Sequence, residues 1–278
     1  MDRTTGVPMH HGVWQTGNPN PTWSARLMRP IRHRSGRRRW LTAAAAILLV
    51  LSTASTALAA GKPGYPDRVT WSGETWAVKT SRSPVGPGPN IFSKANVSVD
   101  SQGRLHLRIA KDAAGGWTTA EIIGPRTYGY GTYTFTLGSA VNALDPNVVL
   151  GLFTWSDRAR FAHREIDIEF ARWGNAADST NAQYVVQPWD VASHLSRFTQ
   201  PADATTTHQF TWRPGGIDWQ SLDSAGSPIA SYAYTGTDVP PTGDERVRLN
   251  LWLFNGSAPT DGQPVEVIID SFVFTPLP

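Results

Sequence analysis

Residues Thr132–Leu137 read TYTFTL, and this alternation of polar and apolar side chains decides the fold of the chain. A β-strand turns successive side chains to opposite faces, so a period of two predicts a strand with one buried face. Turn-forming residues separate further runs of this kind, and no long stretch after Ala60 has helical periodicity. The other runs lie at Arg104–Ile109, His208–Trp212, Ile217–Leu222, Arg246–Phe254 and Val265–Phe274. The pattern predicts an all-β chain, a two-sheet antiparallel β-sandwich in one domain without internal repeats.

One run, Val148–Phe153, is apolar on both faces. A buried helical segment would give the same pattern at this length. The Val content and the flanking turns favour a central strand, which one side of the sandwich buries.

The first sixty residues read as an export leader. Seven Arg between Arg26 and Arg39 precede an uncharged stretch, and Ala57–Ala59 fits a small-x-small cleavage pattern. We therefore expect a basic extension and signal at residues 1–60, cleavage near Ala59, secretion, and a single domain at residues 61–278. Two alternatives stay open. Arg37–Leu41 resembles a twin-arginine signal, and the uncharged stretch approaches the roughly 20 residues of a membrane anchor.

The charge balance changes once the leader is set aside. The whole chain has a net charge of +3, but from Gly61 onward 17 Lys and Arg face 21 Asp and Glu, a net charge of −4. No basic footprint for nucleic acid remains. The chain has no Cys, so its fold rests on a core that about 218 residues can bury without disulfides. We expect a monomer without stable membrane association after signal cleavage.

The segment Glu165–Phe170 reads EIDIEF, which on a strand places Glu165, Asp167 and Glu169 on one face and the apolar residues on the other. Alternate residues of a strand lie only about 6–7 Å apart. Like charges so close disfavour full ionisation, so at least one carboxyl should have a raised pKa. Glycoside hydrolysis uses one ionised and one protonated carboxyl. The acidic outer face of an ordinary half-exposed strand remains the alternative.

Five segments, in chain order, resemble glycoside hydrolase family 16, and the likeness runs from about Trp71 to Pro276. They are Tyr128–Tyr133 (YGYGTY), Gly151–Trp155 (GLFTW), Glu165–Phe170 (EIDIEF), Phe210–Trp219 (FTWRPGGIDW) and Leu249–Trp252 (LNLW). The resemblance implies a concanavalin A-like jelly roll with a concave glycan-binding cleft, so residues 61–278 would be a catalytic domain.

The resemblance also implies roles for the three acids in a retaining endo-glycoside hydrolase. Glu165 matches the nucleophile, Asp167 the assisting carboxylate that hydrogen-bonds it, and Glu169 the general acid/base. The compact spacing of the motif goes with lichenases and xyloglucan enzymes and favours a β-1,3-1,4- or β-1,3-glucan substrate, although Ala171–Asn175 is not the usual lichenase continuation. A transglycosylase or a non-catalytic carbohydrate-binding sandwich is the alternative.

Aromatic side chains near the acidic segment are candidates for stacking on sugar rings. With Gln187, which can hydrogen-bond sugar hydroxyls, the expected substrate-binding residues are Trp155, Trp173, Trp189 and Trp252; core packing is the alternative for each Trp. Gln183 is a further candidate of the same kind as Gln187. We expect no cofactor and no metal site, because the His residues lack ligand spacing. A structural calcium is compatible with such a fold, but the sequence has no loop signature for it.

Overall fold

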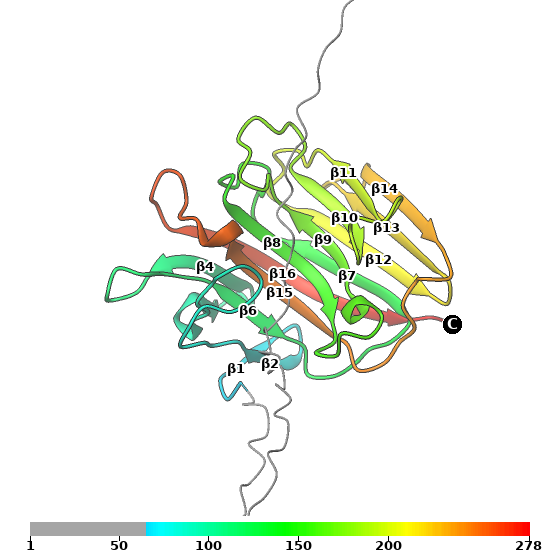
Figure 1. Ribbon diagram of the computed structural model, residues 1–278, viewed down its shortest axis with the longest axis horizontal. Helices are drawn as coiled ribbons and strands as arrows, with labels where there is room; N and C mark the ends of the chain where they lie inside the picture. Colours follow the sequence, from blue (N-terminus) through cyan, green and yellow to red (C-terminus); the bar gives the residue numbers. More distant parts are fainter. Residues whose placement is uncertain (1–64) are drawn as a thin grey trace, which may run out of the picture. The chain divides into compact units, whose positions relative to one another are not determined.

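Two antiparallel sheets of eight strands each lie face to face in the computed structural model, which describes residues 65–278 (Figure 1). The first sheet has the order β1 (Arg68–Trp71), β2 (Glu74–Val78), β6 (Ala120–Ile123), β15 (Arg246–Leu253), β8 (Val148–Trp155), β9 (Ile166–Phe170), β10 (Ala182–Val186) and β11 (Leu195–Phe198). The second has the order β14 (Pro228–Thr235), β13 (Gly216–Leu222), β12 (Thr206–Arg213), β7 (Gly131–Leu137), β16 (Val265–Pro276), β4 (Leu105–Lys111) and β3 (Val97–Val99), with β5 (Trp117–Thr118) paired to β4. The predicted jelly-roll sandwich is confirmed.

Helical structure in the described residues is limited to three single turns, which are the 3-10 segments η1 (Lys94–Asn96), η2 (Ala162–Arg164) and η3 (Phe254–Gly256). Within residues 65–278 no helix has the length and apolarity needed to cross a membrane. The export signal, its cleavage near Ala59 and the twin-arginine alternative lie outside the described residues.

The core forms where the alternating strands of the two sheets face each other. In β7 the side chains of Tyr133, Phe135 and Leu137 are at most 1% exposed, while the Thr residues between them are partly exposed. The ring of Tyr133 stacks on Phe210 of β12 with centroids 4.6 Å apart. Burial of this aromatic layer stabilises the sandwich in the way that the period-two runs predicted.

Strand β8 is central in the first sheet, between β15 and β9, as its continuous apolar sequence predicted. Its two faces contact different groups. Leu150 and Leu152 point into the core between the sheets. Val149 instead packs with Ala171 and Trp252 in a second, smaller apolar cluster. Because alternate residues of a strand face opposite ways, this cluster lies on the face of the first sheet that is turned away from the core, called here the outer face.

Polar side chains inside the core are joined in a hydrogen-bonded chain. His208 is fully buried, its Nδ1 lies 2.7 Å from Ser221 Oγ, and its Nε2 lies 2.8 Å from Thr206 Oγ1. The hydroxyl of Tyr184, from the first sheet, lies 2.6 Å from the same Ser221 Oγ and so connects the two sheets. Burial lowers the pKa of His208 to about 3, so the imidazole is neutral in the folded protein.

Candidate active site

Strand β9 presents its acidic residues on the outer face of the first sheet. Ile166 and Ile168 are fully buried in the core, so the alternation of the strand turns Asp167 and Glu169 the other way. Glu165 directly precedes the strand. Asp167 is 2% exposed, whereas Glu165 and Glu169 are half-buried. The three carboxyls therefore share one face, as the sequence spacing predicted.

Burial and mutual repulsion raise the pKa of all three carboxyls. Burial raises the pKa of Glu165 well above 4.5, and the charge of Glu169 raises it further, while Arg248 opposes the rise. Burial also raises the pKa of Asp167 well above its ordinary value, with added repulsion from the two Glu. Burial raises the pKa of Glu169 to about 7. Groups that interact this strongly titrate together, so each charge on one of these acids opposes ionisation of the others.

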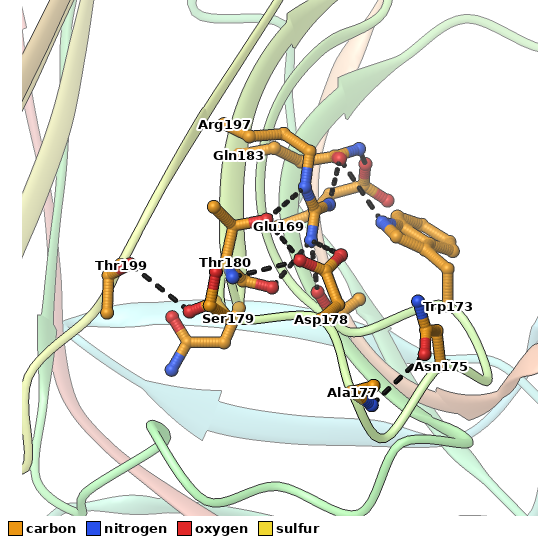
Figure 2. Close-up of polar contacts among 12 residues, drawn as sticks. Glu169, Trp173, Asn175, Ala177, Asp178, Ser179, Thr180, Gln183, Arg197 and Thr199 are labelled. Atoms are coloured by element: carbon orange, nitrogen blue, oxygen red, sulfur yellow. Dashed lines mark hydrogen bonds and ion pairs between the residues drawn. The ribbon is translucent and has the colours of Figure 1, made fainter. Parts of the chain in front are cut away.

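Glu169 has a hydrogen-bonded side chain beside it on the neighbouring strand. Gln183 of β10 lies directly across from Glu169 in the strand register, and its Nε2 donates to Glu169 Oε2 at 2.8 Å. The Oε1 of the same amide accepts from Arg197 Nη1 at 2.7 Å and from Trp173 Nε1 at 3.1 Å. Figure 2 shows these side chains converging on the Gln183 amide. The hydrogen bond from Gln183 and the charge of Arg197 both oppose the rise of the Glu169 pKa.

Asp167 is held by Gln187, a predicted substrate-binding residue. Gln187 Nε2 donates to Asp167 Oδ2 at 3.2 Å, and the backbone N–H of Trp189 donates to Gln187 Oε1 at 3.0 Å. The structure thus brings Gln187 to the acids and links the Trp189 backbone to the same site. The expected hydrogen bond from Asp167 to Glu165 stays a prediction.

The curated relatives that match the chain are named β-glucanases. No family model matches the chain. A β-glucanase of Paenibacillus macerans is 28% identical over 191 residues, which are 67% of this chain and 74% of the relative. The Bacillus licheniformis β-glucanase structure matches with a TM-score of 0.57 and 23% identity, over 76% of this chain and 95% of that one. A glycoside hydrolase family 16 endo-glucanase from Bacteroides ovatus matches with a TM-score of 0.53 and 13% identity, over 72% and 94%. This chain is β-glucanase-like and has the family 16 fold.

A turn with left-handed backbone conformation directly precedes Glu165 in the chain. Phe161, Ala162, His163 and Arg164 have φ values of 55°, 46°, 60° and 52°, a region that residues with side chains rarely enter. Glu165 then returns to extended backbone at φ −90°. Such strain persists only where surrounding contacts over-determine it.

The contacts that hold this turn come from β8 and the residue that follows it. The backbone N–H of Ser156 donates to the His163 carbonyl at 2.7 Å, and His163 Nδ1 contacts the Ser156 carbonyl at 2.8 Å. Thr154 Oγ1 donates to the Arg164 carbonyl at 2.8 Å and accepts from the N–H of Ile166 at 3.1 Å. The turn therefore fixes the backbone on both sides of Glu165.

The four candidate tryptophans lie in different settings. Trp155 stacks on His163 with centroids 4.1 Å apart and an interplanar angle of 9°. Trp173 packs against Trp252 at 6.1 Å and against Phe254 at 5.5 Å. Trp252 is only 2% exposed, so it takes part in packing on the outer face. Trp189 is half-buried. Their contact with a sugar stays a prediction.

A buried charge network, which the sequence analysis did not identify, lies on β6 and β15. Glu121 is 1% exposed and accepts from Lys79 Nζ at 2.6 Å and from Arg248 Nη1 at 3.1 Å. Arg248 also contacts Asp157 at 3.3 Å. The core position of Ile122 places Glu121 on the outer face, and Arg248 connects this network to the acids by lowering the pKa of Glu165. A lone Glu within the apolar stretch 120–123 was the available signal.

Gly151 keeps the space beside Glu169 free of a side chain. It lies across from Glu169 on one side and from Asn250 on the other. A Cβ at this position would lie 2.5 Å from Asn250 Oδ1, closer than real Cβ atoms approach.

Among the residues that the structure describes, no group of three or more His, Asp or Glu could hold a metal ion.

Proposed function

We propose that this chain is an endo-acting glycoside hydrolase that cleaves β-glucan with retention of configuration. The observation that carries the proposal is the row of three coupled carboxyls, Glu165, Asp167 and Glu169, on the outer face of β9. The family 16 fold and relatives named as β-glucanases support the same activity. A module that only bound glycan would gain nothing from three adjacent acids whose pKa values are all raised.

The chemistry follows a double displacement. In the first step a Glu165 carboxylate oxygen bonds to the anomeric carbon, the bond to the leaving oxygen breaks, and Glu169 transfers its proton to that oxygen. In the second step the Glu169 carboxylate takes a proton from water, whose oxygen attacks the anomeric carbon and releases Glu165. Asp167 assists by interacting with Glu165, as the family resemblance implies.

The surroundings of the two Glu residues fit these different roles. Burial and the charge of Glu169 raise the pKa of Glu165, and the charge of Arg248 opposes this rise and so favours the ionised form that a nucleophile needs. The pKa of Glu169, about 7, keeps a large share of this group protonated near neutral pH, as a general acid requires. The nucleophile role of Glu165 and the acid/base role of Glu169 are supported by these different neighbours.

The proposed substrate is a β-1,3-1,4- or β-1,3-glucan lying across the outer face. Sugar rings stack on aromatic faces through apolar contact. The expected stacking residues are Trp155, Trp173, Trp189 and Trp252, and the amide of Gln187 is expected to hydrogen-bond sugar hydroxyls.

We further propose that the chain is exported by its N-terminal signal and acts as a secreted monomer. N-terminal sequencing and light scattering of secreted material would test this.

The test is a panel of polysaccharides, namely barley glucan, laminarin, xyloglucan and agarose, incubated with the wild type and with Glu165→Gln. We expect loss of at least about 10³-fold in kcat for the variant on the cleaved glucan, with the fold retained, because the nucleophile is gone. The matched control is Glu266→Gln on the second sheet, which should retain activity. Unchanged turnover by Glu165→Gln refutes the mechanism.

A second experiment tests the stereochemistry. Nuclear magnetic resonance of the first-formed product shows its anomeric configuration, and an inverted anomer refutes retention. Products longer than the substrate indicate transglycosylation.

A further inference from the structure

A row of three polar side chains crosses the first sheet at the position of the proposed acid/base. In the strand register Gln183 of β10 lies across from Glu169 of β9 on one side and from Arg197 of β11 on the other. The three side chains are joined in that order by hydrogen bonds of 2.8 and 2.7 Å. Arg197 is therefore connected to Glu169 through the amide of Gln183.

The Gln183 amide can have only one orientation in this row. Its Oε1 accepts two hydrogen bonds, from Arg197 Nη1 and from Trp173 Nε1. Guanidinium and indole N–H groups are donors only, so an amide turned by 180° would place its NH₂ group against two donors. Gln183 is only 5% exposed, and losing both hydrogen bonds at a buried group is costly. The Nε2 is therefore held toward Glu169 Oε2.

This orientation decides which oxygen of Glu169 carries the proton. The Nε2 of Gln183 has no free lone pair, so it cannot accept a hydrogen bond from a protonated Oε2. The carbonyl-type oxygen is the better acceptor of the N–H, which leaves the proton on Oε1. We propose that Arg197 is a positioning residue for the acid/base step: with Trp173 it fixes the Gln183 amide so that the transferable proton of Glu169 stays on Oε1.

Arg197 is itself held from its other sides, which makes the row rigid. Its Nε donates to Thr180 Oγ1 at 2.7 Å, and its Nη2 pairs with Asp178 Oδ2 at 2.7 Å and with the Thr180 carbonyl at 2.7 Å (Figure 2). Nη2 also lies 3.2 Å from the Ala171 carbonyl. Only a planar guanidinium fork can make these contacts and reach Gln183 together, which a Lys ammonium cannot do.

The same contacts are also compatible with a purely structural role, in which Arg197 only anchors the loop between β9 and β10. The positioning role and the structural role differ in what removal of Arg197 does to proton transfer from Glu169. A glucan leaves as a sugar alkoxide and needs the proton, whereas an aryl oligoglucoside with a dinitrophenolate leaving group departs without it. A loose loop would slow both substrates alike. A misplaced proton slows the glucan alone.

This inference rests on the proposed function, and its experiment compares kcat/KM for barley glucan and for the dinitrophenyl oligoglucoside. For Arg197→Met we expect a loss of about 10²-fold on glucan and less than about 5-fold on the aryl substrate. The upper limb of the pH profile should move to higher pH, because the charge of Arg197 holds down the pKa of Glu169. Arg197→Lys should keep the glucan defect while its pH limb stays closer to the wild type.

Two further variants keep the test decisive. Thr199→Val removes a loop hydrogen bond to the Ser179 carbonyl without touching Gln183, and should leave both rates within about 2-fold. If Arg197→Met does not fold, Asp178→Asn removes the ion pair that holds Arg197 Nη2 and should show a smaller defect of the same kind. Equal losses on both substrates, or an unmoved pH limb, overturn the positioning role. A wild type that cleaves neither the aryl substrate nor any of barley glucan, laminarin and xyloglucan overturns the proposed function instead.

Discussion

Replacing Glu169 by Gln should stabilise the folded protein, and only at neutral and higher pH. Burial raises the pKa of this carboxyl from its ordinary 4.5 to about 7. The folded state thus favours the protonated form, so its stabilising contribution is complete below pH 4.5 and is lost as pH rises through 7. Linkage between these two values gives a loss of about 3 kcal/mol in the free energy of unfolding at pH 7 relative to pH 4.

The Gln variant avoids this loss because its amide oxygen accepts the same hydrogen bond from Gln183 and never ionises. Urea unfolding followed by tryptophan fluorescence at pH 4, 5.5, 7 and 8 measures the difference. We expect equal stability at pH 4 and a variant more stable by about 3 kcal/mol at pH 7 to 8. Glu266→Gln is the control, since Glu266 is 41% exposed and paired with Arg108 and His106, and its replacement should change stability by about 1 kcal/mol or less. Parallel curves for the wild type and Glu169→Gln would refute the reasoning.

Two further substitutions test other features of the fold. Gly151→Ala places a Cβ against Asn250 Oδ1 beside Glu169, so we expect a loss of about 1–3 kcal/mol in unfolding free energy and a lower kcat/KM on glucan, whereas Gly86→Ala, with open space around it, should keep both. His208→Gln should remove much of the acid sensitivity: a pKa lowered to about 3 makes the wild type lose about 3 kcal/mol between pH 8 and pH 4, as unfolded chains take up the proton below pH 6.5. Urea titrations measure both effects, and a His208→Gln curve parallel to the wild type would contradict the second.

The sequence predicted the strands in which apolar and polar residues alternate regularly. It missed strands in which a polar residue is buried by hydrogen bonds to a neighbouring strand. The run Thr132–Leu137 became most of β7 because alternate residues enter the core. Strand β10 was not predicted, since Gln183 interrupts its apolar pattern and is buried only because its amide is bonded on both sides. Strand β14 was missed because it begins at Pro228 and is partly exposed, as an edge strand can be.

Some features of the candidate active site follow from the sequence of a single strand, whereas others depend on which strands are neighbours in the sheet. The shared face of the three acids follows from the period of one strand, so the sequence alone indicated it. The links from Glu169 to Arg197 and from Arg248 to Glu121 depend on which strands are neighbours and in what register. No local pattern contains that register, and Arg197 was therefore not a candidate.

The left-handed turn before Glu165 has a consequence for engineering this protein. Glycine usually weakens a fold because it adds freedom to the unfolded chain. At Ala162, where φ is 46°, any residue with a Cβ raises the free energy of the native backbone by about 1 kcal/mol or more. A search for heat-tolerant variants should therefore include glycine at this position, where the customary preference for alanine is reversed.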